Sequence, residues 1–309
     1  MKAGVGVLGS IHMDYVIILD RMPRLGETVI GRGFKMTPGG KGANQAVAAA
    51  RLGAEVYMIG MVGNDVIGEE LIKNFRRNRV NVDYVKRAET HSGVALIFVD
   101  SEGNNVIAVA PGADYHLSKE DVDEAFRDLR DRIGVLLLQL EIPIEIVEYA
   151  IRRFSEDGVK IILNPAPYHE LSKDALSRVF IATPNEIELE LMSGIRIAND
   201  EDLIKAGRKV VEDLGIENLI VTLGGRGAMI ITRDQHKLIP AFKVKPVDTT
   251  GAGDAFNGAL AVALVRGESL ESAVRYANAV AALSTLKLGA QEALPTSEEV
   301  EKFLEERGG

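Results

Sequence analysis

The sequence contains no cysteine, and its few histidines are scattered along the chain. Without cysteine, thiol catalysis, cysteine-ligated zinc sites and disulfides are excluded together, and a reducing compartment fits. The five histidines, at positions 12, 91, 116, 169 and 236, lack the spacing of metal ligands, so we expect no zinc site.

Excess positive charge and long apolar runs are missing too. The net charge of −9 argues against a general role on nucleic acid or on a membrane surface. No run approaches 18 uncharged apolar residues, and the opening residues 1–5 show no signal peptide, so we expect a cytosolic protein. The chain has 309 residues, of which 46% are apolar and 26% charged. It can therefore bury a hydrophobic core that needs no disulfide or metal to stabilise it.

Short β-rich apolar runs alternate with longer helical patterns, which is typical of βαβ units and a mostly parallel sheet. We therefore predict an α/β fold. The expected strands are Val5–Leu8, Val56–Met61, Val135–Leu138, Lys160–Leu163, Val179–Ala182 and Leu219–Leu223. The expected helices are Gly42–Leu52, Ile67–Asn78, Ser118–Arg132, Ile144–Phe154, Asp200–Leu214, Ala252–Arg266, Leu270–Leu286 and Ser297–Glu306.

Two stretches do not follow this alternation. Val94–Asp100 and Asn105–Ala110 flank the residues Ser-Glu-Gly-Asn, a good hairpin signal, and Tyr15–Leu19 and Thr28–Gly33 also look extended. We predict that they form a small sheet projecting from the core, either as a lid or as a dimer surface. The expected organisation is one domain with an inserted sheet: residues 1–11, 39–90 and 113–309 form the core, and residues 12–38 and 91–112 form the lid.

The segment from Asp248 to Phe256 reads DTTGAGDAF, a glycine-rich turn that opens a helix. The amides of Gly251, Ala252 and Gly253 can face an anion there. A carboxylate beside those amides is unusual, because it repels the anion that they attract. The arrangement makes sense if Asp254 accepts a proton from a hydroxyl while the amides stabilise a phosphoryl group. A helix start with an Asp favoured by the macrodipole is the simpler alternative, but the whole pattern favours catalysis.

A second glycine turn, Gly39-Gly40-Lys41-Gly42, also runs into a helix. Paired glycines allow a ligand close to the backbone, and Lys41 and Asn44 suit sugar hydroxyls. The spacing is not that of a Walker A loop, and a tight turn with a solvated lysine is an equal alternative for this segment by itself. Asp14, just after the first strand, could accept hydrogen bonds from sugar hydroxyls or could simply be a turn aspartate.

The segments that follow two further expected strands contain residues that could bind a nucleotide. In Thr183–Glu188, Glu186 or Glu188 could orient Mg²⁺ through water and Asn185 could reach a phosphate, although acidic residues in a first helical turn also simply compensate the dipole. The glycine-rich loop Thr222–Gly227 either wraps a nucleotide or forms a tight turn, and the local sequence favours neither interpretation.

One apparent motif is rejected. Residues Gly4 to Gly9 match G-x-G-x-x-G, but these glycines lie within the first expected strand, and an extended segment follows instead of a helix. A dinucleotide-binding dehydrogenase is therefore not expected.

Taken together, these residues resemble the PfkB family of carbohydrate kinases and, within it, the ribokinases, because the GGKGANQ form around Lys41 is similar to that group. The resemblance covers nearly the whole chain. It rests on Gly39–Leu52, Ser92–Val99, Gln139–Glu141, Asn164–Pro167, Thr183–Glu186, Asp248–Gly258 and Gly289–Gln291.

The resemblance implies a three-layer fold with a β-sheet lid and phosphorylation of the 5-hydroxyl of D-ribose, with a nucleoside, ribose 1-phosphate or another sugar as alternative acceptors. A non-catalytic sugar or nucleotide sensor is the alternative from another class. It implies Asp254 as the catalytic base and Gly251, Ala252 and Gly253 as the anion hole. The implied sugar-binding residues are Asp14, Gly40, Lys41, Asn44 and Glu141.

The resemblance also implies ATP as the donor, with ADP left open, and a homodimer formed through the lid. The implied nucleotide-binding residues are Asn185, Thr222, Gly224, Gly227 and Asn278. Glu188 would organise Mg²⁺ through water. A monovalent cation, potassium, would bind mostly to backbone atoms at Asp248, Thr250, Ser284, Lys287 and Gly289. Ala293 departs from the family pattern, in which a hydroxyl residue often contributes to that site.

Overall fold

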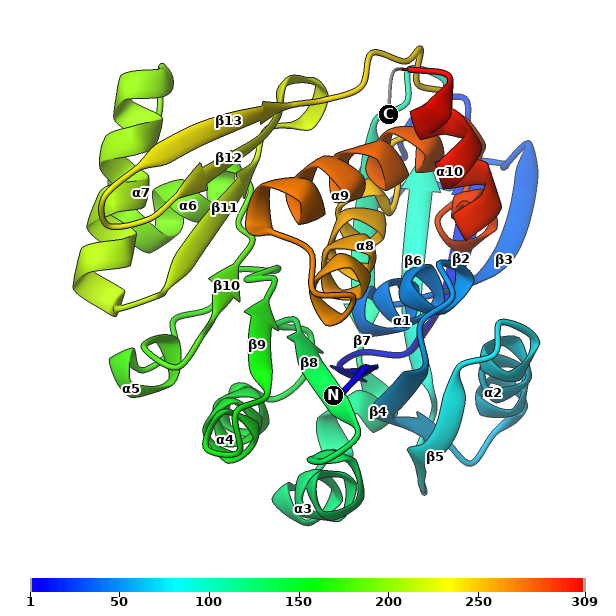
Figure 1. Cartoon of the computed structure of the whole chain (residues 1–309). Helices are drawn as coiled ribbons and strands as arrows, with labels where there is room; N and C mark the ends of the chain where they lie inside the picture. The colour runs from blue at the N-terminus through cyan, green and yellow to red at the C-terminus, as the bar shows by residue number, and fades with distance from the viewer. Residues whose placement is uncertain (1, 308–309) are drawn as a thin grey trace.

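The structure, a computed structural model, describes residues 2–307. Residues 1, 308 and 309, which end two of the predicted core segments, lie outside the described part. The main sheet has nine strands in the order β13-β12-β11-β10-β9-β8-β1-β4-β5 (Figure 1). They are β1 (Gly4–Leu8), β4 (Val56–Gly63), β5 (Asn81–Ala88), β8 (Ile133–Leu138), β9 (Lys160–Leu163), β10 (Ile181–Ala182), β11 (Asn218–Thr222), β12 (Gly227–Ile231) and β13 (His236–Pro240).

Neighbouring strands from β5 to β11 pair in parallel, and only β12 and β13 add antiparallel pairs. Helices cover both faces of the sheet (Figure 1). One face packs against α1 (Lys41–Arg51), α2 (Val66–Arg77), α8 (Ala252–Val265), α9 (Leu270–Ser284) and α10 (Ser297–Glu305). The other packs against α3 (Lys119–Leu129), α4 (Ile144–Ser155), α5 (Lys173–Leu176), α6 (Glu186–Ser193) and α7 (Asp200–Leu214).

The strand sequences explain this layering. Along β8, Val135 and Leu137 enter the core beside α8, whereas Leu136 and Leu138 enter the opposite core. A strand that is buried on both faces needs a continuous apolar run, and that is the pattern found. The predicted α/β fold with a mostly parallel sheet between helices is confirmed.

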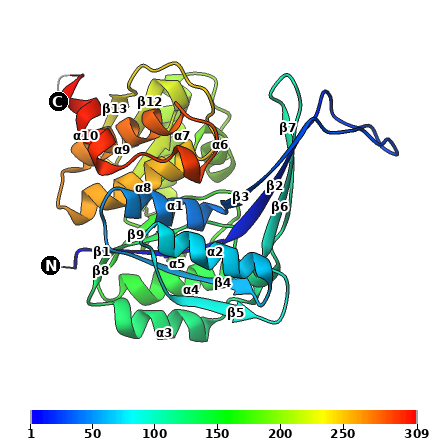
Figure 2. The same ribbon diagram turned by 90° about the vertical axis from the view of Figure 1, so that its right-hand side faces the viewer.

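A second, small sheet has the order β3-β2-β6-β7 and projects from one edge of the core (Figure 2). Its strands are β2 (His12–Ile18), β3 (Gly33–Gly39), β6 (Gly93–Val99) and β7 (Asn105–Ala110). At its base, His12 Nε2 lies 2.8 Å from Asp114 Oδ2 on the short helix η1 (Gly112–His116), and both side chains are buried. We call these four strands the small sheet; their division from the core as a lid stays a prediction.

Three local expectations need correction. Thr28–Gly33 is not a strand, because β2 pairs with β3 only from Gly33 onward and residues 20–32 form a mostly exposed loop (Figure 2). Strands β5 and β13 were not expected. Both lie at the edges of the main sheet, where a half-exposed strand contains polar residues and loses the apolar pattern.

The rejected G-x-G-x-x-G pattern has a packing explanation. Its first glycines lie in β1, and β2 follows directly. A side chain at Gly9 would place its Cβ 2.0 Å from Gln139 Oε1 and 3.0 Å from Gly42 Cα. The glycine therefore lets α1 begin directly above the end of β1. Within the described residues, no helix has both the length and the apolar character needed to cross a membrane.

Candidate active site

Asp254 lies in the first turn of α8, where α8 packs against α1. The residue is 7% exposed, and its carboxylate accepts hydrogen bonds from Asn44 Nδ2 at 2.9 Å and Gln45 Nε2 at 3.1 Å. Burial raises the pKa of Asp254, while the charge of Lys41 and these two amides oppose the rise. The site thus holds a carboxylate of increased basicity in a fixed orientation, as a general base requires.

The turn before α8 presents backbone amides beside this carboxylate. Gly251 caps the helix with a φ of 74°, a conformation that favours glycine. Among the described residues, the amides of Gly251 and Gly253 make no internal hydrogen bond, whereas the Ala252 amide donates to the Thr249 carbonyl at 3.2 Å. The expectation that all three amides are free is therefore wrong at Ala252, because the left-handed turn directs that N–H back to residue 249.

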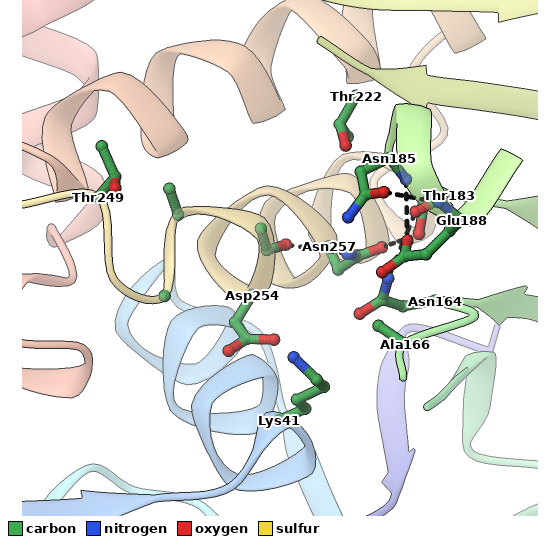
Figure 3. A pocket seen from close by; sticks show the side chains of 13 residues that line it. Lys41, Asn164, Ala166, Thr183, Asn185, Glu188, Thr222, Thr249, Asp254 and Asn257 are labelled. Atoms are coloured by element: carbon green, nitrogen blue, oxygen red, sulfur yellow. Dashed lines mark hydrogen bonds between the residues drawn. The ribbon is translucent and has the colours of Figure 1, made fainter. Parts of the chain in front are cut away.

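A cavity of about 170 Å³ opens in front of these groups (Figure 3). Lys41, the first residue of α1, points its amine toward Asp254 inside it. Burial would lower the pKa of Lys41, but attraction from Asp254, Glu141 and Glu188 prevails and raises it, so the side chain stays cationic. A cation and helix amides around one small cavity are suited to a phosphoryl group.

Asn185 and Glu188 line the opposite wall of the same cavity (Figure 3). They form a capping box at the start of α6: Glu188 N donates to Asn185 Oδ1 at 2.8 Å, and Asn185 N donates to Glu188 Oε2 at 2.9 Å. One carboxylate oxygen of Glu188 remains, and burial raises the pKa of this group. Glu186, the other acidic candidate, instead pairs with Arg226 at 2.7 Å on the surface.

A second cavity, of about 520 Å³, adjoins the first. The predicted nucleotide residues Thr222, Gly224, Gly227 and Asn278 line it. At Gly227, with a φ of 109°, a Cβ would lie 2.1 Å from the Ile239 carbonyl oxygen, so a side chain cannot fit. The two cavities share four lining residues, and thus form one path: Thr222, Thr249, Ala252 and Gly253.

The apolar wall of the larger cavity was not predicted. Phe242 and Val244 come from the irregular segment after β13, and Ala281 and Ala282 come from α9. The alternation of apolar and basic residues at 242–245 was the available signal. Its assignment to a cavity depends on tertiary packing, which the local pattern does not contain.

On the other side of Asp254, the small sheet contributes Asp14. This carboxylate lies against Gly39, where a Cβ would approach Asp14 Oδ2 to 2.2 Å. Burial raises the pKa of Asp14 to about 6, and repulsion from Glu141 and Asp254 adds to the rise. The predicted acceptor-site carboxylates are thus brought close enough to perturb one another.

The remaining predicted acceptor residues surround the start of α1. Glu141 Oε2 accepts from Ser10 Oγ at 2.5 Å and from the Lys41 amide at 3.1 Å, which leaves its other oxygen for a ligand. Gly40 has a φ of 89° and caps α1. Asn44 uses its amide oxygen and one N–H within the protein, on Gln291 and Asp254, and retains one N–H.

The predicted monovalent-cation residues lie in the loop before α8 and at and after the end of α9, and the Asp248 carboxylate joins the two segments. Asp248 Oδ1 accepts from the Thr250 amide and hydroxyl, and Asp248 Oδ2 accepts from the Gly289 amide at 2.9 Å. Ser284 donates its hydroxyl to the Ala281 carbonyl, and the amine of Lys287 pairs with Glu299 of α10. Across residues 2–307, no three His, Cys, Asp or Glu side chains gather as metal ligands.

Comparisons with known proteins extend to the whole chain. A model described as pfkB family carbohydrate kinase matches residues 2–297. The chain is 40% identical to ribokinase from Haemophilus influenzae, covering 99% of each chain, and 40% identical to deoxyribokinase from Salmonella typhi, covering 97% and 98%. It superposes on a structure of Arabidopsis thaliana ribokinase complexed with ribose and ATP with a TM-score of 0.90 and 30% identity, covering 98% and 99%.

Proposed function

Because the chain belongs to the pfkB family of carbohydrate kinases, we propose that it transfers the terminal phosphoryl group of ATP to the 5-hydroxyl of D-ribose. It is a phosphotransferase with an alcohol group as acceptor. The supporting observation is the place of Asp254 between two regions: a cavity that continues into a larger pocket, and the carboxylates of Asp14 and Glu141, whose charges reach Asp254.

In this reaction, Asp254 accepts the proton of the 5-hydroxyl as that oxygen forms its bond to the γ-phosphorus. The bond from phosphorus to the bridging oxygen breaks, and the nucleoside diphosphate leaves. Lys41 and the amides of Gly251 and Gly253 stabilise the charge on the transferred group. Asp14 and the free oxygen of Glu141 accept hydrogen bonds from the sugar and orient it.

The residues present fit Mg²⁺ bound to a nucleotide, which typically keeps several waters and takes one or two protein carboxylates. Glu188, with one uncommitted oxygen at the cavity wall, would hold it through water. When bound, the ion neutralises phosphate charge. We further propose a potassium site made mostly of backbone atoms at Asp248, Thr250, Ser284, Lys287 and Gly289, to which Ala293 adds no hydroxyl.

We also propose a homodimer formed through the small sheet. Its exposed apolar side chains are Ile18, Phe34, Met36, Leu96, Val106, Ile107 and Val109. They lie on both faces of the small sheet: Phe34, Met36, Leu96 and Val106 share one face, and the others lie on the face of Asp14. Exposed apolar side chains that gather in this way usually mark an interaction site. A cytoplasmic location completes the proposal, since the absence of cysteine suits a reducing compartment.

A second candidate acceptor is 2-deoxyribose, because the deoxyribokinase and ribokinase relatives are equally similar to this chain. The two sugars differ only at the 2-position, so the phosphoryl-transfer half of the site would serve both. A nucleoside, ribose 1-phosphate or a non-catalytic sensor are the remaining alternatives.

A donor and acceptor panel tests these assignments. Ribose, 2-deoxyribose, adenosine, cytidine and ribose 1-phosphate are each offered with ATP and with ADP, and formation of the phosphorylated acceptor is measured. We expect the highest kcat/KM with ribose and ATP. A higher kcat/KM with 2-deoxyribose or a nucleoside would overturn the ribose assignment, and sugar binding without turnover would identify a sensor.

A further inference from the structure

A continuous chain of side-chain hydrogen bonds links Asp254 to Arg51, the cation at the other end of α1. Asn44 donates to Asp254 at 2.9 Å, Gln291 Nε2 to Asn44 Oδ1 at 3.0 Å, and Asn74 Nδ2 to Gln291 Oε1 at 2.7 Å. Beyond Asn74, the chain continues outward. Asn78 Nδ2 donates to Asn74 Oδ1 at 3.3 Å, and Arg51 Nε donates to Asn78 Oδ1 at 2.9 Å.

Every donor in this amide chain points toward Asp254, and its two ends require that direction. An ionised carboxylate only accepts hydrogen bonds, and a guanidinium only donates them. Each amide between Arg51 and Asp254 must therefore present its oxygen outward and its NH₂ group inward. A reversed amide at any position would place two acceptors or two donors against each other.

A shorter arm reaches the other oxygen of the same carboxylate. Gln139 Nε2 donates to Gln45 Oε1 at 2.6 Å, and Gln45 Nε2 donates to Asp254 Oδ1 at 3.1 Å. Gln45 and Gln139 are fully buried, and Gln291 is 4% exposed. Buried polar groups of this kind hold one arrangement because water cannot replace a lost partner.

We propose that Gln291 and Gln139 are positioning residues that keep the amides of Asn44 and Gln45 turned with both NH₂ groups toward Asp254. This holds the carboxylate ionised and aimed for its proton transfer. The inference rests on the proposed role of Asp254 as base, and it adds residues that touch neither sugar nor nucleotide.

The groups around Asp254 determine in which direction its pKa changes when Gln291 is lost. Burial and the negative charges of Glu141 and Asp14 favour the protonated form, whereas Lys41 and the two amides favour the carboxylate. When Gln291 is lost, Asn44 is free to present its oxygen to Asp254 in place of its NH₂ group. The pKa of Asp254 then rises, and less of the enzyme is in the proton-accepting form at low pH.

The test measures phosphoryl transfer in single turnovers, with sugar and nucleotide saturating, from about pH 8 down to about pH 5. For Gln291→Met, we expect a rate close to that of the unaltered protein at high pH. At the low end we expect a deficit that grows threefold to tenfold, as an increase of about one pKa unit requires. Asn74→Leu, one step further from Asp254, should give a smaller deficit of the same kind.

Asn218→Leu is the matched control, since Asn218 is also half-buried and its amide donates to a backbone carbonyl away from the amide chain. It should show no pH-dependent deficit. Circular dichroism confirms that each variant is folded. If Gln291→Met does not fold, Asn74→Leu decides the question.

A deficit that is constant with pH in the folded variants would overturn the positioning role and leave only a packing role. Asp254→Asn distinguishes a failure of the proposed base from a failure of the positioning role. If that variant keeps its rate, the proposed base is wrong. If it loses its rate while Gln291→Met shows no pH effect, only the present inference fails.

Discussion

The corner where α1 meets α8 and the small sheet supply opposite halves of one site, and they are built differently. In the corner, Asp254 is buried and both of its oxygens accept hydrogen bonds from buried amides. The small sheet exposes apolar side chains, and among the described residues two ion pairs tie its strands to the core. These pairs are His12–Asp114 at its base and Lys35–Glu292, 3.3 Å apart with both partners about half exposed.

From this difference we expect the corner of α1 and α8 to be rigid and the small sheet to move. The groups to which we assign proton transfer and phosphate binding are positioned by core packing before any substrate enters, which lowers the cost of reorganisation during the proposed reaction. The sheet that contributes Asp14 has few buried contacts away from its base, and such regions open at low free-energy cost. Substrate entry and closure should therefore occur at the small sheet.

The largest effect is expected from a substitution of Asp254 in the rigid corner of α1 and α8. Asp254→Asn keeps the shape of the side chain but removes its basicity, so kcat should fall by ~10²–10⁴, the usual scale for loss of a general base. The KM for both substrates should change little. Steady-state kinetics check this, and a variant with near-normal kcat would remove Asp254 from its role.

A smaller, pH-dependent effect is expected from the small sheet. The pKa of Asp14 is raised to about 6, so this carboxylate becomes protonated as the pH falls through that value. It then accepts hydrogen bonds from the proposed sugar less strongly. Below about pH 6, kcat/KM for ribose should fall toward about tenfold per pH unit, the limit for one titrating group. Titrating kcat/KM against pH checks this.

Asp14→Asn is the companion variant. It should bind ribose weakly at every pH and lose the part of the pH dependence that belongs to Asp14. An unchanged pH profile in Asp14→Asn would show that another group titrates and would contradict the assignment.

The smallest effect should come from breaking the ion pair between Lys35 on β3 and Glu292 on the core. Lys35→Met removes the pair with Glu292 and should raise the KM for ribose by about 1.5–5-fold, because exposed ion pairs contribute about 0.2–1 kcal/mol. The effect should diminish at high salt. Lys237→Met, which breaks an exposed pair with Glu271 on the core, is the matched control and should leave KM unchanged. Equal KM changes in both variants would contradict a specific role for Lys35.

Much of the fold follows from local pattern. Lys160–Leu163 and Asp200–Leu214 have the predicted boundaries, because strong periodicity coincides there with clear helix and strand ends. The edge strand β5 was missed because half of its residues face water. The two glycine turns that each open a helix indicated that Asp254 and Lys41 belong to a site, and the structure places both at one cavity. In contrast, the contact between Gln291 and Asn44 joins residues 247 positions apart, and no local pattern contains it.

The shared wall of the two cavities has a consequence for ligand design. Since Thr222, Thr249, Ala252 and Gly253 belong to both, one tethered molecule with a nucleoside at one end and a polyol at the other can thread the whole path. At the phosphate linker such an inhibitor would meet mainly backbone, which recognises any phosphate. Its selectivity would have to come from the polyol end, where we propose that Asp14 and Glu141 bind.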